Sequence, residues 1–185
     1  VTSGLSLYKP ETDSFQHFPF EMNTSRPLGT YFMILSIQEH QNKLWVGTFN
    51  SGLWSMDLAN LGKPGIVNIT DKDNDNNLPN NTVYASLPDS DGNLWISTNQ
   101  GISKYEIKKN HFINFSTADG LQHEEFNRLA YFKCASGEIV FGGINGLNIF
   151  NPKSITIQEE NYNPKLLGIS VYSEDSNEST FQGLL

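Results

Sequence analysis

A five-residue phrase returns three times in this chain, and its spacing limits the folds that the chain can adopt. The copies are LWVGT at 44–48, LWIST at 94–98 and a weaker IVFGG at 139–143. Their first residues are 94 − 44 = 50 and 139 − 94 = 45 residues apart. That distance is the size of one four-stranded blade of a β-propeller, so the spacing predicts a repeat protein built from such blades.

A glycine follows each phrase and defines a second repeating column. Its members are Gly4, Gly52, Gly101 and Gly146, with spacings of 48, 49 and 45. In the clearest unit the alternating patterns predict strands at 83–87, 94–98, 102–107 and 112–116, separated by Gly, Asn and Asp turns and followed by a polar crossover at 117–127. No segment has sustained helical periodicity, and we expect an all-β fold.

The columns divide the chain into a series of blades that does not close into a ring. We expect the end of a preceding blade at 1–25, with its third and fourth strands. Complete blades follow at 26–76 and 77–127, and a last blade without a clear fourth strand follows at 128–160. From 161 to 185 the repeat pattern is lost, and we expect a linker and the start of another, immunoglobulin-like β domain. The chain is therefore expected to be a segment of a longer protein.

Composition excludes several classes of partner. The net charge is −8, from 12 basic and 20 acidic residues, and no basic patch offsets it, which disfavours nucleic acids and anionic lipid surfaces. The single cysteine, Cys134, has no second thiol for a disulfide or metal site, and we expect it to pack in a strand. The longest apolar stretch, at 31–37, is far shorter than the roughly 20 residues that span a bilayer. We expect a soluble segment without cofactor or metal.

The repeat resembles that of the two-component regulator propellers. The resemblance rests on LPNNTV at 78–83, DGNLWIST at 91–98 and GISKY at 101–105. In the last unit, DGL at 119–121, EFN at 125–127 and FGGINGLNIFNP at 141–152 resemble the closing blade of that family, which precedes an immunoglobulin-like domain with spaced tyrosines. The chain departs from the pattern at Ser97, at Val140 in the tryptophan column, and at 41–43, where QNK replaces the DGN turn.

This resemblance implies a function in signalling. Such propellers form the periplasmic sensor region of hybrid two-component histidine kinases, found mostly in gut Bacteroidetes, with one membrane helix leading to the cytoplasmic kinase. Their signals are usually oligosaccharides cut from dietary or host polysaccharides. None of the kinase residues lies in this segment, so we expect it to sense or dimerise but not to catalyse.

Functional residues are expected where the repeat is broken. Trp45 and Trp95 recur at one blade position and are interpreted as core. Trp54 stands in a column otherwise filled by Ser and Asn, and we expect it to be partly exposed. In a propeller, the turns between second and third strands share one face with the crossovers between blades. The candidate ligand-binding residues on that face are Trp54, Asn50, Asn99, Gln100, His123, Arg128 and Asn145.

The chemistry of this set suits a sugar. An aromatic ring stacks on the apolar side of a pyranose, amides bond its hydroxyls, and Arg128 could bind a uronate or sulfate through two hydrogen bonds. Each residue also has a structural alternative. Trp54 could contact another domain or subunit, and Arg128 could form a solvated salt bridge with nearby Glu124 or Glu125.

The sequence gives weaker support for two other functions, calcium binding and catalysis. The stretch 71–77 alternates carboxylates as a calcium loop does, but Asn76 replaces the expected glycine and Thr82 the expected glutamate, so we interpret it as a solvated crossover. No nucleophile elbow, phosphate loop or zinc motif is present. The alternatives to an oligosaccharide sensor are a protein-interaction scaffold and, third, a carbohydrate-cleaving propeller. Because unpaired strands at the open ends invite pairing, we also expect a homo-oligomer.

Overall fold

The structure is a computed structural model that describes residues 4–19, 33–60, 67–70, 77–156, 169–173 and 176–181. The chain forms two compact units, Val1–Ile155 and Thr156–Leu185. In the second unit, β14 (Ile169–Ser173) and β15 (Ser176–Phe181) pair as an antiparallel hairpin. Within the described ranges, no helix has the length and apolar character needed to cross a bilayer.

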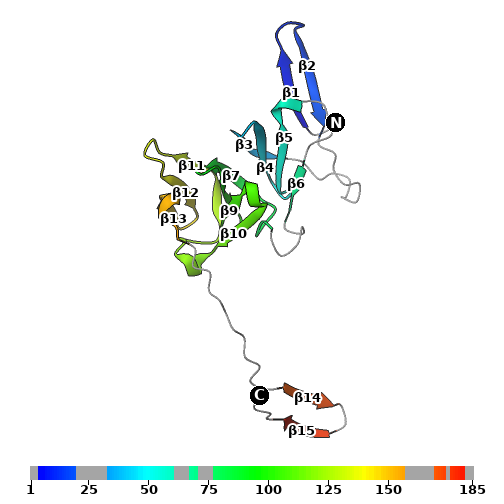
Figure 1. Cartoon of the computed structure of the whole chain (residues 1–185), viewed down its shortest axis with the longest axis vertical. Helices are drawn as coiled ribbons and strands as arrows, with labels where there is room; N and C mark the ends of the chain where they lie inside the picture. The colour runs from blue at the N-terminus through cyan, green and yellow to red at the C-terminus, as the bar shows by residue number, and fades with distance from the viewer. Residues whose placement is uncertain are drawn as a thin grey trace. The chain divides into compact units, whose positions relative to one another are not determined.

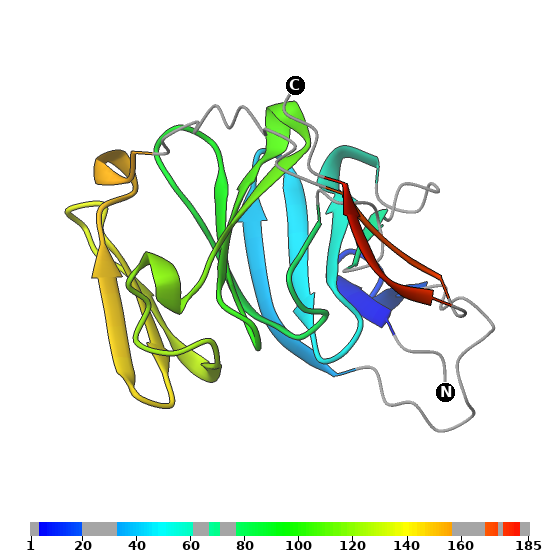
Figure 2. The same ribbon diagram turned by 90° about the horizontal axis from the view of Figure 1, so that it is seen from below.

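The first unit consists of four antiparallel sheets that follow one another along the chain (Figures 1 and 2). The expected all-β fold of four-stranded blades is confirmed. The sheets are an initial pair, two complete blades and a last blade of three strands. Their strands are β1 (Gly4–Lys9) and β2 (Ser14–Pro19); β3 (Ile34–His40), β4 (Lys43–Thr48), β5 (Leu53–Asp57) and β6 (Val67–Ile69); β7 (Val83–Pro88), β8 (Leu94–Thr98), β9 (Ile102–Glu106) and β10 (His111–Phe115); and β11 (Phe126–Lys133), β12 (Ile139–Gly143) and β13 (Gly146–Phe150).

The repeated phrase forms the second strand of each blade, namely β4, β8 and β12. The first strands β3, β7 and β11 pack beside one another, so each blade joins the next along its first strand. Residues two apart on a strand point to the same side of the sheet. One side of each blade therefore faces the preceding blade and the other faces the following one.

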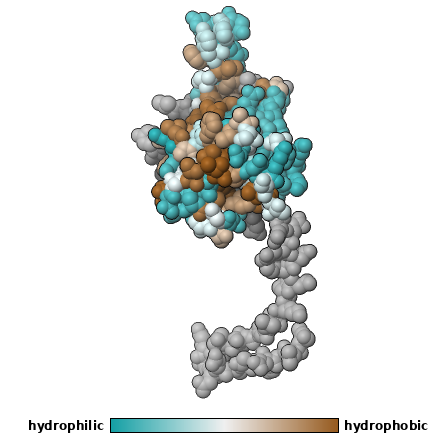
Figure 3. Space-filling view, turned by 90° about the vertical axis from the view of Figure 1, so that its left-hand side faces the viewer, coloured by the Kyte–Doolittle hydropathy of each residue, from teal (hydrophilic) through white to brown (hydrophobic). Residues whose placement is uncertain are grey.

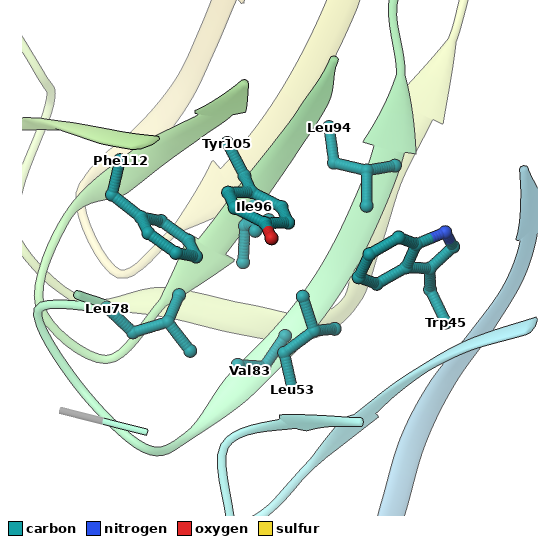
Figure 4. Packing of buried hydrophobic residues seen from close by; sticks show 8 residues of the cluster. All are labelled: Trp45, Leu53, Leu78, Val83, Leu94, Ile96, Tyr105 and Phe112. Atoms are coloured by element: carbon teal, nitrogen blue, oxygen red, sulfur yellow. The ribbon is translucent and has the colours of Figure 1, made fainter. Parts of the chain in front are cut away.

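Both phrase tryptophans bridge neighbouring blades. Trp45 is 2% exposed and meets Tyr105 of the next blade edge to face, with ring centroids 5.9 Å apart. Figure 4 shows this cluster, in which Leu53 of one blade packs with Leu94 and Phe112 of the next. Trp95, also 2% exposed, repeats the arrangement one blade later against Phe150, at 4.7 Å. The interpretation of the phrase tryptophans as core residues is confirmed.

The outer side of the last blade carries an exposed apolar row. Phe132 pairs with Val140 and Val140 with Ile149, so the three side chains lie across β11, β12 and β13 on one side. Phe132 is 65% and Ile149 58% exposed. In Figure 3, hydrophobic residues gather at the end of the molecule where this blade lies. Val140 occupies the tryptophan column, but no described blade covers it.

This outer row predicts self-association of the 185-residue chain. Exposed apolar side chains beside β13, which ends its sheet among the described residues, favour contact with a second copy. We expect sedimentation velocity to show species larger than a monomer at micromolar concentration. Replacing Phe132 and Ile149 together by Ser should shift the distribution toward monomer. Phe49→Ser, which removes a half-exposed ring from a turn of the first complete blade, should leave it unchanged. A wild-type chain that is entirely monomeric would contradict the prediction.

The turn before β8 is organised by one buried carboxylate. Asp89 is 7% exposed and accepts hydrogen bonds from the backbone N–H groups of Asp91 and Asn93, both at 2.9 Å. It also accepts from the Asn93 side chain at 3.0 Å and from the Trp95 indole at 3.1 Å. Burial alone would raise the pKa of Asp89, but these four hydrogen bonds outweigh it and hold the pKa below its ordinary value.

Asp89→Ala should therefore destabilise the fold by about 2–4 kcal/mol, because it leaves the buried Trp95 N–H unpaired and opens the turn. Urea denaturation would measure the change, with exposed Asp91→Ala as the control at about 0.5 kcal/mol or less.

The same carboxylate predicts a pH dependence of stability. Since the pKa of Asp89 is lowered in the folded state, its contribution to the free energy of unfolding is present above the unfolded value of about 3.9 and is lost as pH falls below it. This part of the acid destabilisation should disappear in Asp89→Asn.

Candidate functional site

The turns between second and third strands lie against the crossovers between blades. The Gly52 N–H donates to the Asn81 carbonyl at 2.8 Å, and the Gly101 N–H donates to the Glu124 carbonyl at 2.6 Å. In the last blade, the Ile144 N–H donates to the Glu125 carbonyl at 3.3 Å. Turns and crossovers therefore share one face of the three blades, as expected from the sequence. We call the residues 48–52, 80–84, 98–101, 122–128 and 144–146 the turn face.

Two of the predicted amides are held by the fold itself. Asn50 accepts a hydrogen bond from the Thr82 hydroxyl at 2.9 Å, and its own N–H donates to that hydroxyl at 3.3 Å. The Asn145 N–H donates to the Gln122 side-chain oxygen at 2.8 Å, and the Asn145 amide donates to the Gln122 carbonyl at 3.2 Å. Both residues lie on the turn face, where they tie a turn to a crossover.

Two other predicted amides are exposed at the second turn. Asn99 accepts a hydrogen bond from the Tyr84 hydroxyl at 3.0 Å, and Gln100 is exposed beside it. Burial and the charge of Glu125 raise the pKa of Tyr84 above its ordinary value. The hydroxyl is protonated at neutral pH even without this shift, and it donates to Asn99. Tyr84 was not predicted from the sequence, because it begins an ordinary strand pattern.

Arg128 lies in an enlarged bulge of the first strand of the last blade. The strand begins at Phe126, before the expected start of the last blade at 128, and its pairing with β12 jumps from Phe126–Gly143 to Tyr131–Phe141. The corresponding first strands β3 and β7 each jump by one extra residue, whereas β11 jumps by three. Leu129 adopts a φ of 65°, and Arg128 is exposed. Bulges of this kind redirect side chains beside functional sites.

The expected salt bridge between Arg128 and a neighbouring glutamate is not among the ion pairs of the described residues. The Glu124 carboxylate accepts instead from the Thr117 N–H and hydroxyl, both at 2.8 Å. The Arg128 guanidinium reaches across to the first complete blade, where it lies 3.7 Å from the Met33 sulfur. His123 is exposed nearby in the crossover, and its Nδ1 accepts from the Glu125 N–H at 3.1 Å.

The expectation that Trp54 is partly exposed is wrong. Trp54 is 6% exposed and packs with Val46, Leu5 and Ile34 between the first complete blade and the strands before it. Its indole N–H donates to the Ser51 carbonyl at 2.9 Å. The side of β5 that carries Trp54 faces the preceding blade, so a large ring there fills an interior space. It offers no free face to a ligand.

The aromatic ring that the turn face exposes is Phe49. It follows the phrase directly, in the column of Asn99 and Ile144, and is 46% exposed. Its N–H donates to the Met33 carbonyl at 2.9 Å, which places it beside the residue that Arg128 contacts. The sequence carried a usable signal, since an aromatic residue in a turn column shared with Asn is as unusual as Trp54 among serines.

The acidic stretch 71–77, which we interpret as a solvated crossover and not as a calcium loop, lies outside the described residues except for Asn77. In the described ranges, no group of three His, Cys, Asp or Glu side chains could hold a metal ion. The turn face offers amides, the Tyr84 phenol, the Arg128 guanidinium and the exposed Phe49 ring, together with the His123 imidazole and the carboxylates of Glu124 and Glu125.

The contrast between the two aromatic residues gives a stability test. Trp54→Ala should lower the free energy of unfolding by about 3–5 kcal/mol, because it leaves a cavity between blades. Phe49→Ala should change it by less than about 1 kcal/mol, since the ring is half exposed. Urea denaturation of the two variants side by side measures both values. Equal losses would mean that the assigned burial of one ring is incorrect.

Comparison with known proteins shows what the repeat is similar to. Residues 77–100 match the family described as two component regulator propeller. Over 92 residues the chain is 33% identical to Histidine kinase P4 of Formosa agariphila, an alignment that covers 50% of this chain and 7% of that protein.

Two solved structures have the same fold. The extracellular domain of the putative hybrid two component system BT3049 from B. thetaiotaomicron superposes with a TM-score of 0.64 at 25% identity, over 96% of this chain and 23% of that chain. The extracellular domain of the putative one component system BT4673 from the same organism gives 0.62 at 17% identity, over 80% and 19%. The present chain thus spans a small part of each relative.

Proposed function

This chain carries the blades of a two-component regulator propeller, and from that premise we propose that it senses oligosaccharides for a hybrid two-component histidine kinase. It is periplasmic, in the sensor region of a membrane-anchored parent whose kinase lies on the other side of the membrane. The segment itself binds and transmits, and the phosphorylation chemistry belongs to the rest of the parent. The controlled genes would be those for use of the polysaccharide that yields the ligand.

The observation that carries the proposal is the grouping of Phe49 and Arg128 on the turn face. Met33 joins them, because its carbonyl accepts from the Phe49 N–H at 2.9 Å and its sulfur lies 3.7 Å from the Arg128 guanidinium. A half-exposed residue and an exposed cation, far apart in the sequence, thus both contact Met33. Neither is needed to complete a described core cluster.

This pairing fits a sugar that carries an anionic group. The ring of Phe49 can stack on the C–H face of a pyranose, and Arg128 can bind a carboxylate or sulfate through two parallel hydrogen bonds. The exposed amides of Asn99 and Gln100 on the adjacent turn supply donors and acceptors for hydroxyl groups. Asn50 and Asn145 support the site through the fold.

Calorimetry of the complete ectodomain against defined oligosaccharides tests the proposal. The panel should pair neutral glycans with uronate-containing and sulfated ones. Phe49→Ala should weaken the binding glycan by about tenfold or more, since stacking on an aromatic ring is worth about 1–3 kcal/mol in the measured case of nucleic-acid bases. Arg128→Gln should act on anionic glycans and leave neutral ones unchanged.

Matched controls keep this experiment sharp. Phe15 is 70% exposed on β2 and Lys133 is exposed at the far end of β11, so Phe15→Ala and Lys133→Gln remove a ring and a cation away from the turn face. Both should bind like the wild type. If no glycan of the panel gives a heat of binding, the proposal of sugar sensing is refuted. Normal binding by Phe49→Ala and Arg128→Gln would refute this placement of the site.

A protein-interaction scaffold is the second candidate function. The exposed outer row of Phe132, Val140 and Ile149 favours it, because an apolar sheet face of this kind suits a protein partner better than a sugar. In that case the double substitution of Phe132 and Ile149 by Ser in the complete ectodomain would abolish homo-oligomerisation and signalling while glycans of the panel gave no heat.

A further inference from the structure

The bulge at the start of β11 is larger than the other two blades require. In each first strand the pairing skips at the turn-face end, and the residue left without a partner on the second strand is Leu35 in β3 and Tyr84 in β7. In β11 the residues in that place are 127–129, because Ala130 lies against Gly142. Leu35 is buried and Tyr84 half-buried, whereas 127–129 are all exposed. One residue is enough to build a blade, so the two added ones are available for another role.

Leu129 holds a backbone conformation that disfavours leucine. Its φ of 65° lies in the left-handed region, which Gly, Asn and Asp tolerate much better than a residue with a large apolar side chain. The other described residues with positive φ, glycine aside, all carry polar side chains; they are Asp13, Gln41, Asn42, Asn50 and Asn110. Leu129 is the apolar exception to this pattern.

Packing among the described residues does not explain the leucine either. Leu129 is 73% exposed, more than any other large hydrophobic residue in the described ranges, and it belongs to none of their core clusters. A residue that keeps an unfavourable conformation is typical of functional sites. Asn or Gly in its place would relieve the backbone without loss of core packing. The exposed leucine side chain is therefore the feature that the site requires.

The neighbours of Leu129 belong to the proposed ligand site. Arg128 precedes it directly, and the Arg128 guanidinium lies 3.7 Å from the sulfur of Met33, which is itself 44% exposed. The bulge thus combines an exposed aliphatic residue with the cation assigned to an anionic sugar. Apolar groups around a charge pair exclude water and strengthen the attraction between the charges. A leucine in this place suits a ligand that is apolar next to its anion.

We propose that Leu129 is a ligand-contacting residue that sets part of the specificity of the turn face, a role that rests on the proposed function. Its side chain packs on the C–H groups that flank the carboxylate or sulfate held by Arg128. The bulge 127–129 accordingly selects anionic sugars whose charge lies beside an apolar face. Neutral glycans lack the charged half of this contact.

Calorimetry of the complete ectodomain with the uronate-containing and sulfated glycans tests the contact. Leu129→Asn suits the left-handed backbone but removes the apolar side chain, so it should weaken binding of the anionic glycan by about fivefold or more. Leu129→Met keeps an apolar side chain of similar volume and should bind within about twofold of the wild type. Leu7→Asn, which removes a 43% exposed leucine from β1, is the control and should leave binding unchanged.

The outcomes separate this role from the proposed function. Wild-type affinity in Leu129→Asn would overturn the role of Leu129 and leave sugar sensing intact. Absence of heat for every glycan would refute sugar sensing and the contact with it.

Thermal unfolding of the same variants without glycan distinguishes a ligand contact from packing. Because Asn relieves the backbone, Leu129→Asn should melt at the wild-type temperature or above it, although it binds more weakly. Stability that is kept or gained while affinity is lost is the signature of a binding residue. A melting temperature below that of the wild type would mean that Leu129 is buried against another part of the parent, and would overturn the proposal.

Discussion

The structure depends on a contact that each blade makes with its successor. The tryptophan of the repeated phrase points out of its own sheet and is covered by side chains of the next blade, as Trp45 is covered with Tyr105 and Trp95 with Phe150. A two-sided sheet has an apolar row on each side, and neither row can be buried inside a single blade. Neighbouring blades therefore bury each other, and the row that ends the described series at Val140 remains open.

In this arrangement the strands and the connections between them have different roles. Side chains within the strands are committed to packing, so sequence change there is limited by volume and shape. Turns and crossovers lie on one face and are held by backbone hydrogen bonds such as that from Gly101 to Glu124. With the backbone fixed in this way, turn side chains such as Phe49 and Gln100 are free to vary. A single scaffold can thus present different surfaces to different ligands.

Much of the fold could be predicted because a repeat reports the same position several times. The phrase and the following glycine located the second and third strands, and β8 has the expected bounds of 94 and 98. The same logic fails for Trp54, because a column of small polar residues predicts an exposed position. That column faces the preceding blade, where Ser103 and Asn148 make interior hydrogen bonds and Trp54 fills the space with a ring.

The candidate site was less predictable, for a physical reason. Asn50 and Asn145 were placed on the correct face, but their hydrogen bonds to Thr82 and Gln122 join residues from different turns and crossovers. Such partners are defined by how blades sit side by side and not by spacing along the chain. The enlarged bulge around Arg128 also escaped detection, because inserted residues at a strand start look like a longer crossover.

The direction of the tryptophan contacts has a consequence for synthesis. Because Trp45 and Trp95 are each covered by residues that come later in the chain, a blade leaving the ribosome still has its largest ring uncovered. Its tryptophan becomes buried only when the following 45 to 50 residues have emerged. The growing chain therefore always has one blade with exposed apolar surface at its C-terminal end. In a protein of many blades, that tip is the natural substrate for chaperones that hold exported chains until they are complete.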